Sequence, residues 1–352
     1  MTRKRTQNAR DVVVMMLPNG SRAGGNPFVG LLVSHLDDDI TTVPFSWKRA
    51  LSGRFDVFHA HWPEYLLQSP RRSARIARMV ALVAVVARCR ILHRKIVVTA
   101  HNRAAHDGAD RGTTGLFQWF VRRADLRVFL NSFDQDQIYF REGDLVIPHG
   151  DYAAIVKARD IEGSNRDDAR VIVFGSLRPY KGIESLLDLA SDVPQLTIDV
   201  TGRASDEAYA RHLVTRAQDS TNIELNIGEV SDADLAARIR RAVLVVLPYP
   251  DLYNSGAALL ALTLRRPLLL SDSPTARELR SEFGAALVRT YSAPLTAFDI
   301  SEAVAAAQGV TEDEPGTLTP RREWGSIGRR YSAAFRFAAA SRGQAAEEVD
   351  HP

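Results

Sequence analysis

The sequence predicts an α/β fold of two Rossmann-like domains with parallel sheets, and three observations support this fold class. Short apolar runs rich in valine alternate with longer segments of helical character along the chain. The alternation stops at a polar segment, residues 160–168, and then starts again. The length of 352 residues suits two domains of ordinary size.

The expected strands are apolar runs bounded by glycine, proline or polar residues. They are residues 11–17, 55–60, 95–100, 126–131 and 144–148 in the first half, and 170–174, 195–202, 223–227, 243–248 and 267–271 in the second. The expected helices are residues 28–36, 73–90, 115–123, 182–190, 205–217, 231–241 and 255–264. Because strands that alternate with helices form right-handed βαβ units, both sheets should be parallel. Ligands of such sheets bind beyond the carboxyl ends of the strands, so two facing domains place the site in the cleft between them.

The same pattern gives the domain boundaries. We expect a first domain over residues 1–155, a linker over 156–168 and a second domain over 169–320. An amphipathic helix is expected over residues 321–340, because apolar side chains recur there at spacings of three and four, at Trp324, Ile327, Tyr331 and Phe335. The polar residues 341–352 are expected to form a disordered tail.

Composition narrows the class of protein. The one cysteine, Cys89, excludes an internal disulfide framework and suits a reducing cytoplasm. We expect no signal peptide, because residues 1–10 are polar and basic and no adequate apolar region precedes Pro18. We expect no membrane-spanning helix, because no apolar run approaches the roughly 18 residues that spanning requires. Residues 1–155 contain 22 Lys and Arg against 14 Asp and Glu, whereas the remainder contains 23 against 28. The basic first half points to an anionic partner such as a phosphate, a membrane surface or a nucleic acid.

The most informative motif runs from Gly175 to Gly182, Gly-Ser-Leu-Arg-Pro-Tyr-Lys-Gly, between an expected strand and an expected helix. Arg178 and Lys181, together with amides at the start of the helix, would form an anion site suited to a diphosphate. The alternative is a surface turn with solvated cations, because short basic loops are common.

Two further loops follow expected strands. Asn254, Ser255 and Gly256 would hold phosphate or ribose hydroxyls, or would simply cap the helix that follows. Gly24 and Gly25 come after the first strand, where adjacent glycines let a ligand approach the backbone closely.

Taken in order, these motifs resemble those of glycosyltransferases with the GT-B fold, in the broad family 4-like group. The segment from Gly175 to Gly182 is similar to that group's Gly-Arg-Leu-x-x-x-Lys-Gly element. Residues 228–235, Gly-Glu-Val-Ser-Asp-Ala-Asp-Leu, resemble its Gly-x-Val segment, which borders the nucleotide base. Residues 99–102, Thr-Ala-His-Asn, resemble its Thr-x-His-Asn segment, and residues 147–151, Ile-Pro-His-Gly-Asp, resemble the hinge into its second domain.

A narrower resemblance is to a sub-group of exopolysaccharide assembly that includes mannosyltransferases using GDP-mannose. It is carried by residues 59–64, His-Ala-His-Trp-Pro-Glu, and by the hinge from Pro148 to Tyr152.

The resemblance implies an acceptor-side first domain and a second domain that binds a nucleotide sugar. It implies donor-binding roles for Gly24, Gly25, His149, Gly175, Gly202, Glu229, Tyr249, Asn254, Ser255 and Gly256. It implies acceptor-binding roles for Asn26, His61 and Trp62. No cofactor is expected, since the GDP- or UDP-linked donor is a substrate, and Arg178 and Lys181 would stabilise the departing diphosphate without a metal.

The sequence departs from the group's pattern at its pair of glutamates. Their places fall at about Leu252 and Leu260, so the carboxylate that usually holds the donor ribose is missing and nucleotide recognition must differ. The arginine after the first glycine of the Lys-containing element is replaced by Ser176, with Arg178 nearby.

An inverting transfer needs a base near the acceptor hydroxyl. Glu64, His101 and Asp107 lie on loops after first-domain strands, and Glu64 is our first choice for the base. If the transfer retains configuration, His101 would contact the donor sugar instead. Because side chains alternate along a strand, at most one of His59 and His61 lines the cleft.

Asp-x-Asp pairs occur at residues 37–39, 134–136 and 232–234. Two of the three fall near expected helix starts, where aspartate interacts favourably with the helix dipole, so we expect structural roles and no metal site.

Residues 71–95 carry eight Lys and Arg and no acid around the apolar core 79–87. The segment is either a buried helix with cationic ends or a peripheral contact with anionic lipid, which would suit a lipid-linked acceptor.

We therefore expect a metal-independent hexosyltransferase, peripheral on the inner face of the plasma membrane, that moves a hexose from a nucleotide sugar to a lipid-linked or growing glycan. One alternative is a sugar-nucleotide epimerase on the same scaffold. A second is a non-catalytic, degenerate transferase that acts as a binding protein, which the missing glutamates favour. No nucleic-acid partner is expected, because the basic helix is the only feature of the sequence that indicates one. The sequence leaves open the base, the sugar, the acceptor and the stereochemical outcome.

Overall fold

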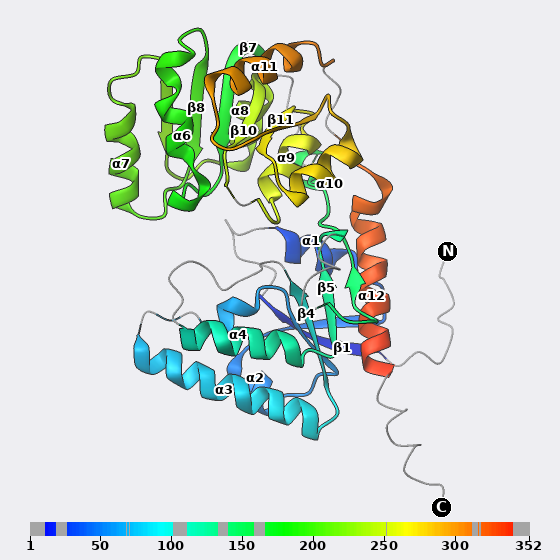
Figure 1. Ribbon diagram of the computed structural model, residues 1–352. Helices are drawn as coiled ribbons and strands as arrows, with labels where there is room; N and C mark the ends of the chain where they lie inside the picture. The colour runs from blue at the N-terminus through cyan, green and yellow to red at the C-terminus, as the bar shows by residue number, and fades with distance from the viewer. Residues whose placement is uncertain are drawn as a thin grey trace, which may run out of the picture. The chain divides into compact units, whose positions relative to one another are not determined.

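The computed structural model describes residues 11–18, 27–67, 69, 71–100, 111–132, 140–157, 166–250, 252–311, 316 and 318–340 (Figure 1). The chain divides into two compact units: unit 1 is residues 1–150 together with 321–352, and unit 2 is residues 151–320. Each unit contains one six-stranded sheet, and neighbouring strands run parallel. The expected α/β fold with two Rossmann-like parallel sheets is confirmed.

The described elements of unit 1 follow the βαβ order. They are β1 (Val12–Leu17), α1 (Phe28–Ser34), β2 (Ile40–Pro44), α2 (Trp47–Ser52), β3 (Val57–Ala60), the 3-10 turn η1 (Pro63–Leu66), α3 (Arg72–Ile91), β4 (Lys95–Ala100), α4 (Arg111–Arg123), β5 (Leu126–Phe129), β6 (Leu145–Val146) and α12 (Trp324–Ala340). The strand order is β2-β1-β3-β4-β5-β6.

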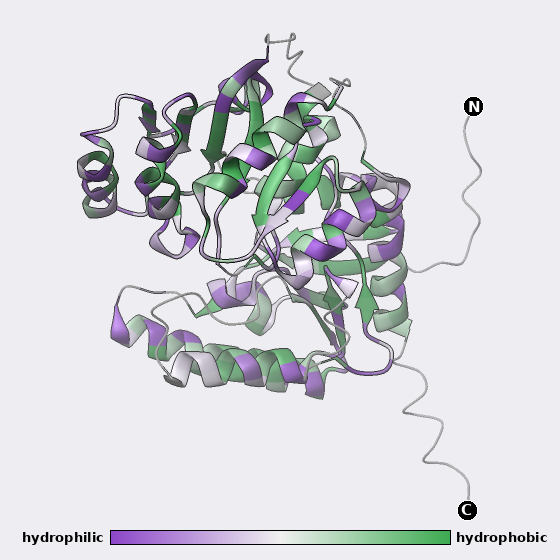
Figure 2. Cartoon of the chain, turned by 45° about the horizontal axis from the view of Figure 1, so that its top comes forward, coloured by the Kyte–Doolittle hydropathy of each residue, from purple (hydrophilic) through white to green (hydrophobic). Residues whose placement is uncertain are grey.

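The sheet of unit 1 is apolar on both faces, because its strands are continuous apolar runs rather than alternating ones. On β4, Ile96 and Val98 face the core formed with α3 and α4, whereas Val97 faces the core formed with α1 and α12. Both faces must therefore be covered by helices. In Figure 2 the green of the strands marks this apolar interior.

Helix α12 belongs to unit 1 although it follows unit 2 in the sequence. Its buried side chains, among them Ile327 and Tyr331, pack on the sheet face that α3 and α4 leave open. The Tyr331 hydroxyl lies 3.1 Å from Thr99 Oγ1, which lies 2.9 Å from Nε2 of the fully buried His59. Burial lowers the pKa of His59 to about 3, so this imidazole is neutral.

The described elements of unit 2 also alternate. They are α5 (Ala153–Lys157), β7 (Asp167–Phe174), η3 (Pro179–Lys181), α6 (Ile183–Asp188), η4 (Ala190–Asp192), β8 (Thr197–Gly202), α7 (Glu207–Ala217), β9 (Ile223–Ile227), α8 (Asp232–Arg241), β10 (Ala242–Leu247), α9 (Gly256–Thr263), β11 (Leu268–Ser271), α10 (Pro274–Phe283), β12 (Val288–Tyr291) and α11 (Ala297–Gln308). The strand order is β12-β11-β10-β7-β8-β9. Helices α6, α7 and α11 cover one face, and α8, α9 and α10 cover the other.

Several element boundaries differ from those expected. The sequence pattern missed the edge strands β2 and β12 and the helices α2, α10 and α11. An edge strand needs only a short and partly polar run, such as Ile-Thr-Thr-Val-Pro in β2, which gives little periodicity. Helix α5 and strand β7 also extend into the expected linker 156–168 from either side.

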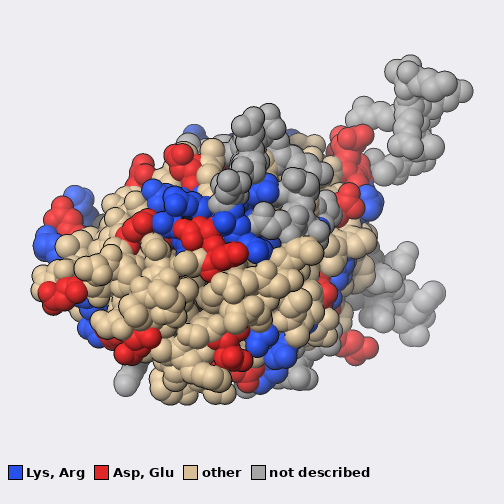
Figure 3. Space-filling model, turned by 90° about the horizontal axis from the view of Figure 1, so that it is seen from above, with Lys and Arg blue, Asp and Glu red and all other residues tan. Residues whose placement is uncertain are grey.

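Among the described residues, no helix has the length and apolar character needed to cross a membrane. On the face seen in Figure 3, basic and acidic side chains lie beside one another.

The packing of α12 on unit 1 depends on Gly328. A Cβ at this position would lie 1.9 Å from the carbonyl oxygen of His35, which is fixed backbone. We predict that Gly328→Ala destabilises the protein by about 3 kcal/mol, measured by urea unfolding, because α12 must move away from the end of α1.

The matched control is Gly325→Ala in the same helix, where the nearest atom is the end of the flexible Arg329 side chain at 3.5 Å. This variant should be as stable as the wild type or more stable by about 0.5 kcal/mol, through helix propensity. Equal stability of the two variants would contradict the assignment of α12 to the unit 1 core.

Candidate functional site

Three glycines stand at the carboxyl ends of three neighbouring strands in unit 2. Gly175 follows β7, Gly202 ends β8 and Gly228 follows β9, and all three have positive φ. The N–H of Gly175 donates to Thr201 O, and the N–H of Gly228 donates to Gly202 O. A Cβ on Gly202 would lie 1.9 Å from the Gly175 carbonyl oxygen, so this approach requires glycine. Gly175, Gly202 and Gly228, here called the glycine shelf, therefore leave the backbone without side chains at the edge where parallel sheets bind their ligands.

Gly175 and Gly202 were expected at a donor site, and the structure brings them into contact. Gly228 begins the segment that resembles a base-bordering element, but no sequence signal predicted that it lies beside Gly175 and Gly202. Glu229 beside it is a surface residue, with its side chain 87% exposed and 3.4 Å from Arg203.

The predicted cations stand next to this shelf but differ in their surroundings. Arg178 is exposed, and its Nε donates to the Ser176 hydroxyl, so the residue that replaces the expected arginine holds Arg178 instead. Lys181 ends η3, and its Nζ lies 4.7 Å from the centre of the Tyr249 ring. Burial, aided by the charge of Arg178, lowers the pKa of Lys181 to about 8.

The loop after β10 supplies the neighbouring wall. Tyr249 is 5% exposed, and its carbonyl accepts a hydrogen bond from Ser271 Oγ at the end of β11. Ser255 caps α9 by accepting from the N–H of Ala258, so the capping role weighed for the loop at 254–256 is present. A Cβ on Gly256 would lie 2.6 Å from the Tyr152 hydroxyl, which explains the glycine at this helix start.

The positions of the missing glutamates are apolar in the structure as well. Leu252 is 3% exposed and belongs to the core that α8, α9 and α10 form on the sheet. Leu260 lies on α9 and packs against the same core. Neither position presents a group that could bind ribose hydroxyls.

In unit 1 the predicted residues after β3 are mostly buried. Glu64 lies in η1 and is 4% exposed. His61 is fully buried, with its ring stacked 4.1 Å from Phe28, and Trp62 is 7% exposed. Tyr65 in the same turn is 44% exposed, so it is the aromatic side chain that this turn presents.

His149 belongs to the same buried cluster as His61. Its ring lies edge-on to Phe28 at 4.8 Å, and its Nδ1 donates to the Gly150 carbonyl. Trp324 at the start of α12 completes the cluster, 5.0 Å from Phe28. The burial of His61, Trp62 and His149 favours support of the loop ends over direct ligand contact, and their binding roles stay predictions.

Four predicted site residues, Gly24, Gly25, Asn26 and His101, lie outside the described residues, as does Asp107. Their expected roles stay predictions.

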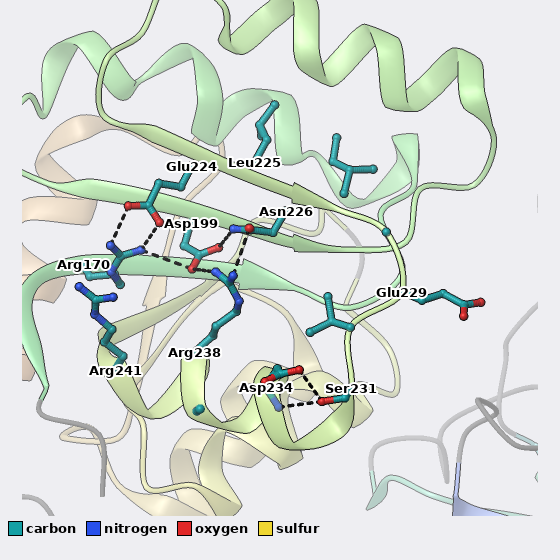
Figure 4. Close-up of a pocket in the computed structure, with 14 residues that line it drawn as sticks. Arg170, Asp199, Glu224, Leu225, Asn226, Glu229, Ser231, Asp234, Arg238 and Arg241 are labelled. Atoms are coloured by element: carbon teal, nitrogen blue, oxygen red, sulfur yellow. Dashed lines mark hydrogen bonds and ion pairs between the residues drawn. The ribbon is translucent and has the colours of Figure 1, made fainter.

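A polar groove of about 730 Å³ lies between β9 and α8 (Figure 4). At its floor the 1%-exposed Asp199 carboxylate pairs with Arg170 and Arg238 and accepts from Asn226. Arg170 also holds Glu224 through two hydrogen bonds. Arg170 and Arg238 are therefore matched by the carboxylates of Asp199 and Glu224 in the same groove, whereas no described carboxylate pairs with Arg178 or Lys181.

Two of the three Asp-x-Asp pairs lie within the described residues, and both have structural roles. Arg336 of α12 bonds to both Asp37 and Asp39. Asp232 and Asp234 lie in the first turn of α8. Within the described ranges no three His, Cys, Asp or Glu side chains are grouped as metal ligands would be. Residues 134–136 lie outside those ranges.

Comparisons with known proteins agree with this geometry. The chain is 29% identical over 348 residues to a GDP-mannose:glycolipid 4-beta-D-mannosyltransferase of Xanthomonas campestris pv. campestris, covering 97% of both chains. Its fold matches HepE of Anabaena, solved with UDP and glucose, with a TM-score of 0.57, 16% identity and coverage of 97% and 99%. No protein-family model matches the chain.

The protein is a glycosyltransferase of the GT-B fold. Over nearly its whole length it is similar to a glycolipid mannosyltransferase, and the expected resemblance is confirmed. The fold alone does not separate transferases from epimerases, because a putative UDP-N-acetylglucosamine 2-epimerase of Listeria monocytogenes shares it, with a TM-score of 0.55, 13% identity and coverage of 98% and 99%.

The Lys181 pKa of about 8 predicts how nucleotide affinity depends on pH. The ammonium is charged below this pH and attracts a diphosphate, and it becomes neutral as the pH rises. Affinity for GDP, measured by calorimetry between pH 7 and 9.5, should fall by about tenfold across that range.

Lys181→Arg is the control, because a guanidinium stays charged throughout this range. Its GDP affinity should be flat with pH. A flat profile for the wild-type protein would show that Lys181 does not contact the diphosphate.

Proposed function

We propose that the protein transfers mannose from GDP-mannose to a lipid-linked glycan acceptor. The proposal extends to this chain the donor and acceptor named for the Xanthomonas relative, whose similarity covers 97% of each chain. The observation that carries it is the pair Arg178 and Lys181 beside three bare strand ends, because this pair supplies positive charge where a donor diphosphate would leave.

The diphosphate gains negative charge as the bond between C1 of mannose and the phosphate oxygen breaks. Fixed cations stabilise that charge most where burial keeps water away. Lys181 is half-buried, whereas Arg178 is exposed. Lys181 is therefore the stronger of the two, with Arg178 closing the outer side of the leaving group.

The relative's name specifies a β linkage. Mannose is α-linked in GDP-mannose, so formation of a β linkage by this chain inverts the configuration at C1. The acceptor oxygen forms its bond to C1 while GDP leaves, and the hydroxyl proton passes to a base. Glu64 is the base we propose, because its carboxylate stands beyond the carboxyl end of β3, shielded from solvent, in the turn that also presents Tyr65.

A transfer assay decides between the alternatives. Purified protein should release GDP from GDP-mannose and mannosylate a lipid-linked saccharide, detected by mass spectrometry, whereas UDP-glucose should give no product. Conversion of the donor sugar without acceptor would identify an epimerase. Nucleotide binding without turnover would identify a non-catalytic protein. Failure of the wild-type protein to bind any nucleotide, together with an unaltered result for Lys181→Ala, would rule out the proposed site.

Glu64→Gln tests the proposed base. It should lower kcat for transfer on the order of 100- to 10,000-fold, because an amide cannot take the proton. GDP affinity should stay within about twofold, because binding of the diphosphate depends on unit 2 cations.

Glu142→Gln, an exposed glutamate of unit 1, is the matched control and should keep wild-type kcat. A Glu64→Gln enzyme with wild-type kcat would move the base elsewhere, and the loop that contains His101 and Asp107 would be tested next.

We further propose that α3 binds an anionic bilayer, at the inner face of the plasma membrane where a lipid-linked acceptor lies. Its inner face, with Leu82, Val85 and Val86, packs in the core. Its outer face carries exposed apolar side chains at helical spacing, Ile76, Val80, Val83 and Ile91, which are 52%, 65%, 45% and 75% exposed. Arginines and no acids accompany them, which suits a headgroup region that is negatively charged.

A variant with Ile76→Asp and Val80→Asp should lose binding to phosphatidylglycerol vesicles by about tenfold in a flotation assay, because carboxylates do not insert among acyl chains and are repelled by anionic headgroups. Val214→Asp on α7, at a 53%-exposed valine of unit 2, should bind as the wild type does. Equal flotation of all three proteins would contradict a membrane role for α3.

A further inference from the structure

The loops that carry Lys181 and Tyr249 are in direct contact. Gly182, directly after Lys181, has left-handed backbone with φ of 63°. A Cβ at this position would lie 2.7 Å from the carbonyl oxygen of Pro248, the residue before Tyr249. The two loops therefore meet backbone to backbone, at the carboxyl ends of the neighbouring strands β7 and β10.

The Tyr249 ring is a fixed surface. It is 5% exposed, belongs to the core over α8 and α9, and its own carbonyl is held by Ser271. Within residues 166–250 and 252–311, its hydroxyl makes no hydrogen bond. What Tyr249 offers to its surroundings is the face of its ring, and the ammonium of Lys181 lies over that face at 4.7 Å from the centre.

We infer that Tyr249 is a positioning residue that acts through Lys181: its ring face holds the ammonium in place for the donor diphosphate. A lysine side chain has four rotatable bonds and would otherwise lose much conformational freedom on binding. A cation held over a buried ring has lost that freedom before the ligand arrives, which favours binding. The resemblance to known transferases implied direct donor contact for Tyr249, and the geometry assigns it this indirect role instead.

The inference rests on the proposed function for the role of Lys181, but its test measures GDP affinity rather than transfer. Tyr249→Phe keeps the ring face and should bind GDP within about twofold of wild type. Tyr249→Leu removes the face and should weaken GDP binding by about tenfold. If the hydroxyl contacted the donor directly, Tyr249→Phe would be the weaker binder by as much as Tyr249→Leu.

A double-mutant cycle separates positioning from damage to the fold. In a Lys181→Met background, Tyr249→Leu should change GDP affinity by less than about twofold, because no ammonium remains to be held. An equal loss in both backgrounds would overturn the inference. Tyr291→Leu, at a buried tyrosine that ends β12, controls for the general cost of losing a buried ring in unit 2, and its GDP affinity should match the wild type.

The outcomes also distinguish this inference from the proposed function. A wild-type protein that binds GDP but transfers no mannose would contradict the proposed function. The GDP affinities of the double-mutant cycle could still be measured and would still test the inference. Mannose transfer by a wild-type protein whose Tyr249→Leu variant binds GDP normally would end the inference alone.

Discussion

The contact between Gly175 and Gly202 is the constraint on which the site in unit 2 depends. Only a residue without a side chain at position 202 allows the ends of β7 and β8 to approach so closely, because a Cβ on Gly202 would fall 1.9 Å from the Gly175 carbonyl oxygen. That approach sets the start of the next loop, since the N–H of Leu177 donates to Arg203 O just beyond it. The loop then turns through η3 and delivers Lys181 toward the end of β10.

Charge at this site comes from Arg178 and Lys181, and within the described part of the chain no carboxylate pairs with either of them. The contrast with the groove between β9 and α8 is direct: there Asp199 and Glu224 neutralise Arg170 and Arg238, whereas Lys181 rests on an aromatic ring. Desolvation and the nearby charge of Arg178 lower the pKa of the Lys181 ammonium, and an anionic ligand would stabilise its charged form. Leu252 and Leu260, where the resemblance implies glutamates, add to this asymmetry because Leu252 lies in the apolar core and Leu260 packs against it.

In unit 1 the described polar side chains after β3 and β6 are mostly buried in the core. His61 and His149 meet across Phe28, and Trp324 of α12 closes the cluster. The indole also explains Gly150, where a Cβ would lie 2.4 Å from the Trp324 ring. The last helix of the chain is thereby part of the support for the loops after β3 and β6, and the turn with Glu64 and Tyr65 stands on that support.

The sequence by itself determined the two parallel sheets, the glycine-rich loop with its two cations and the resemblance to GT-B glycosyltransferases. These features are local: apolar runs, turn residues and short motifs are complete within a few residues of the chain. Only the tertiary structure decided that α12 completes unit 1, that Gly202 meets Gly175, that Lys181 lies over Tyr249, and that Trp62 is buried while Tyr65 is exposed. Each of these depends on contacts between residues far apart in the chain or on which side of a single turn faces the core. The periodicity of the sequence does not predict such contacts, because they form only when the helices pack on the sheets.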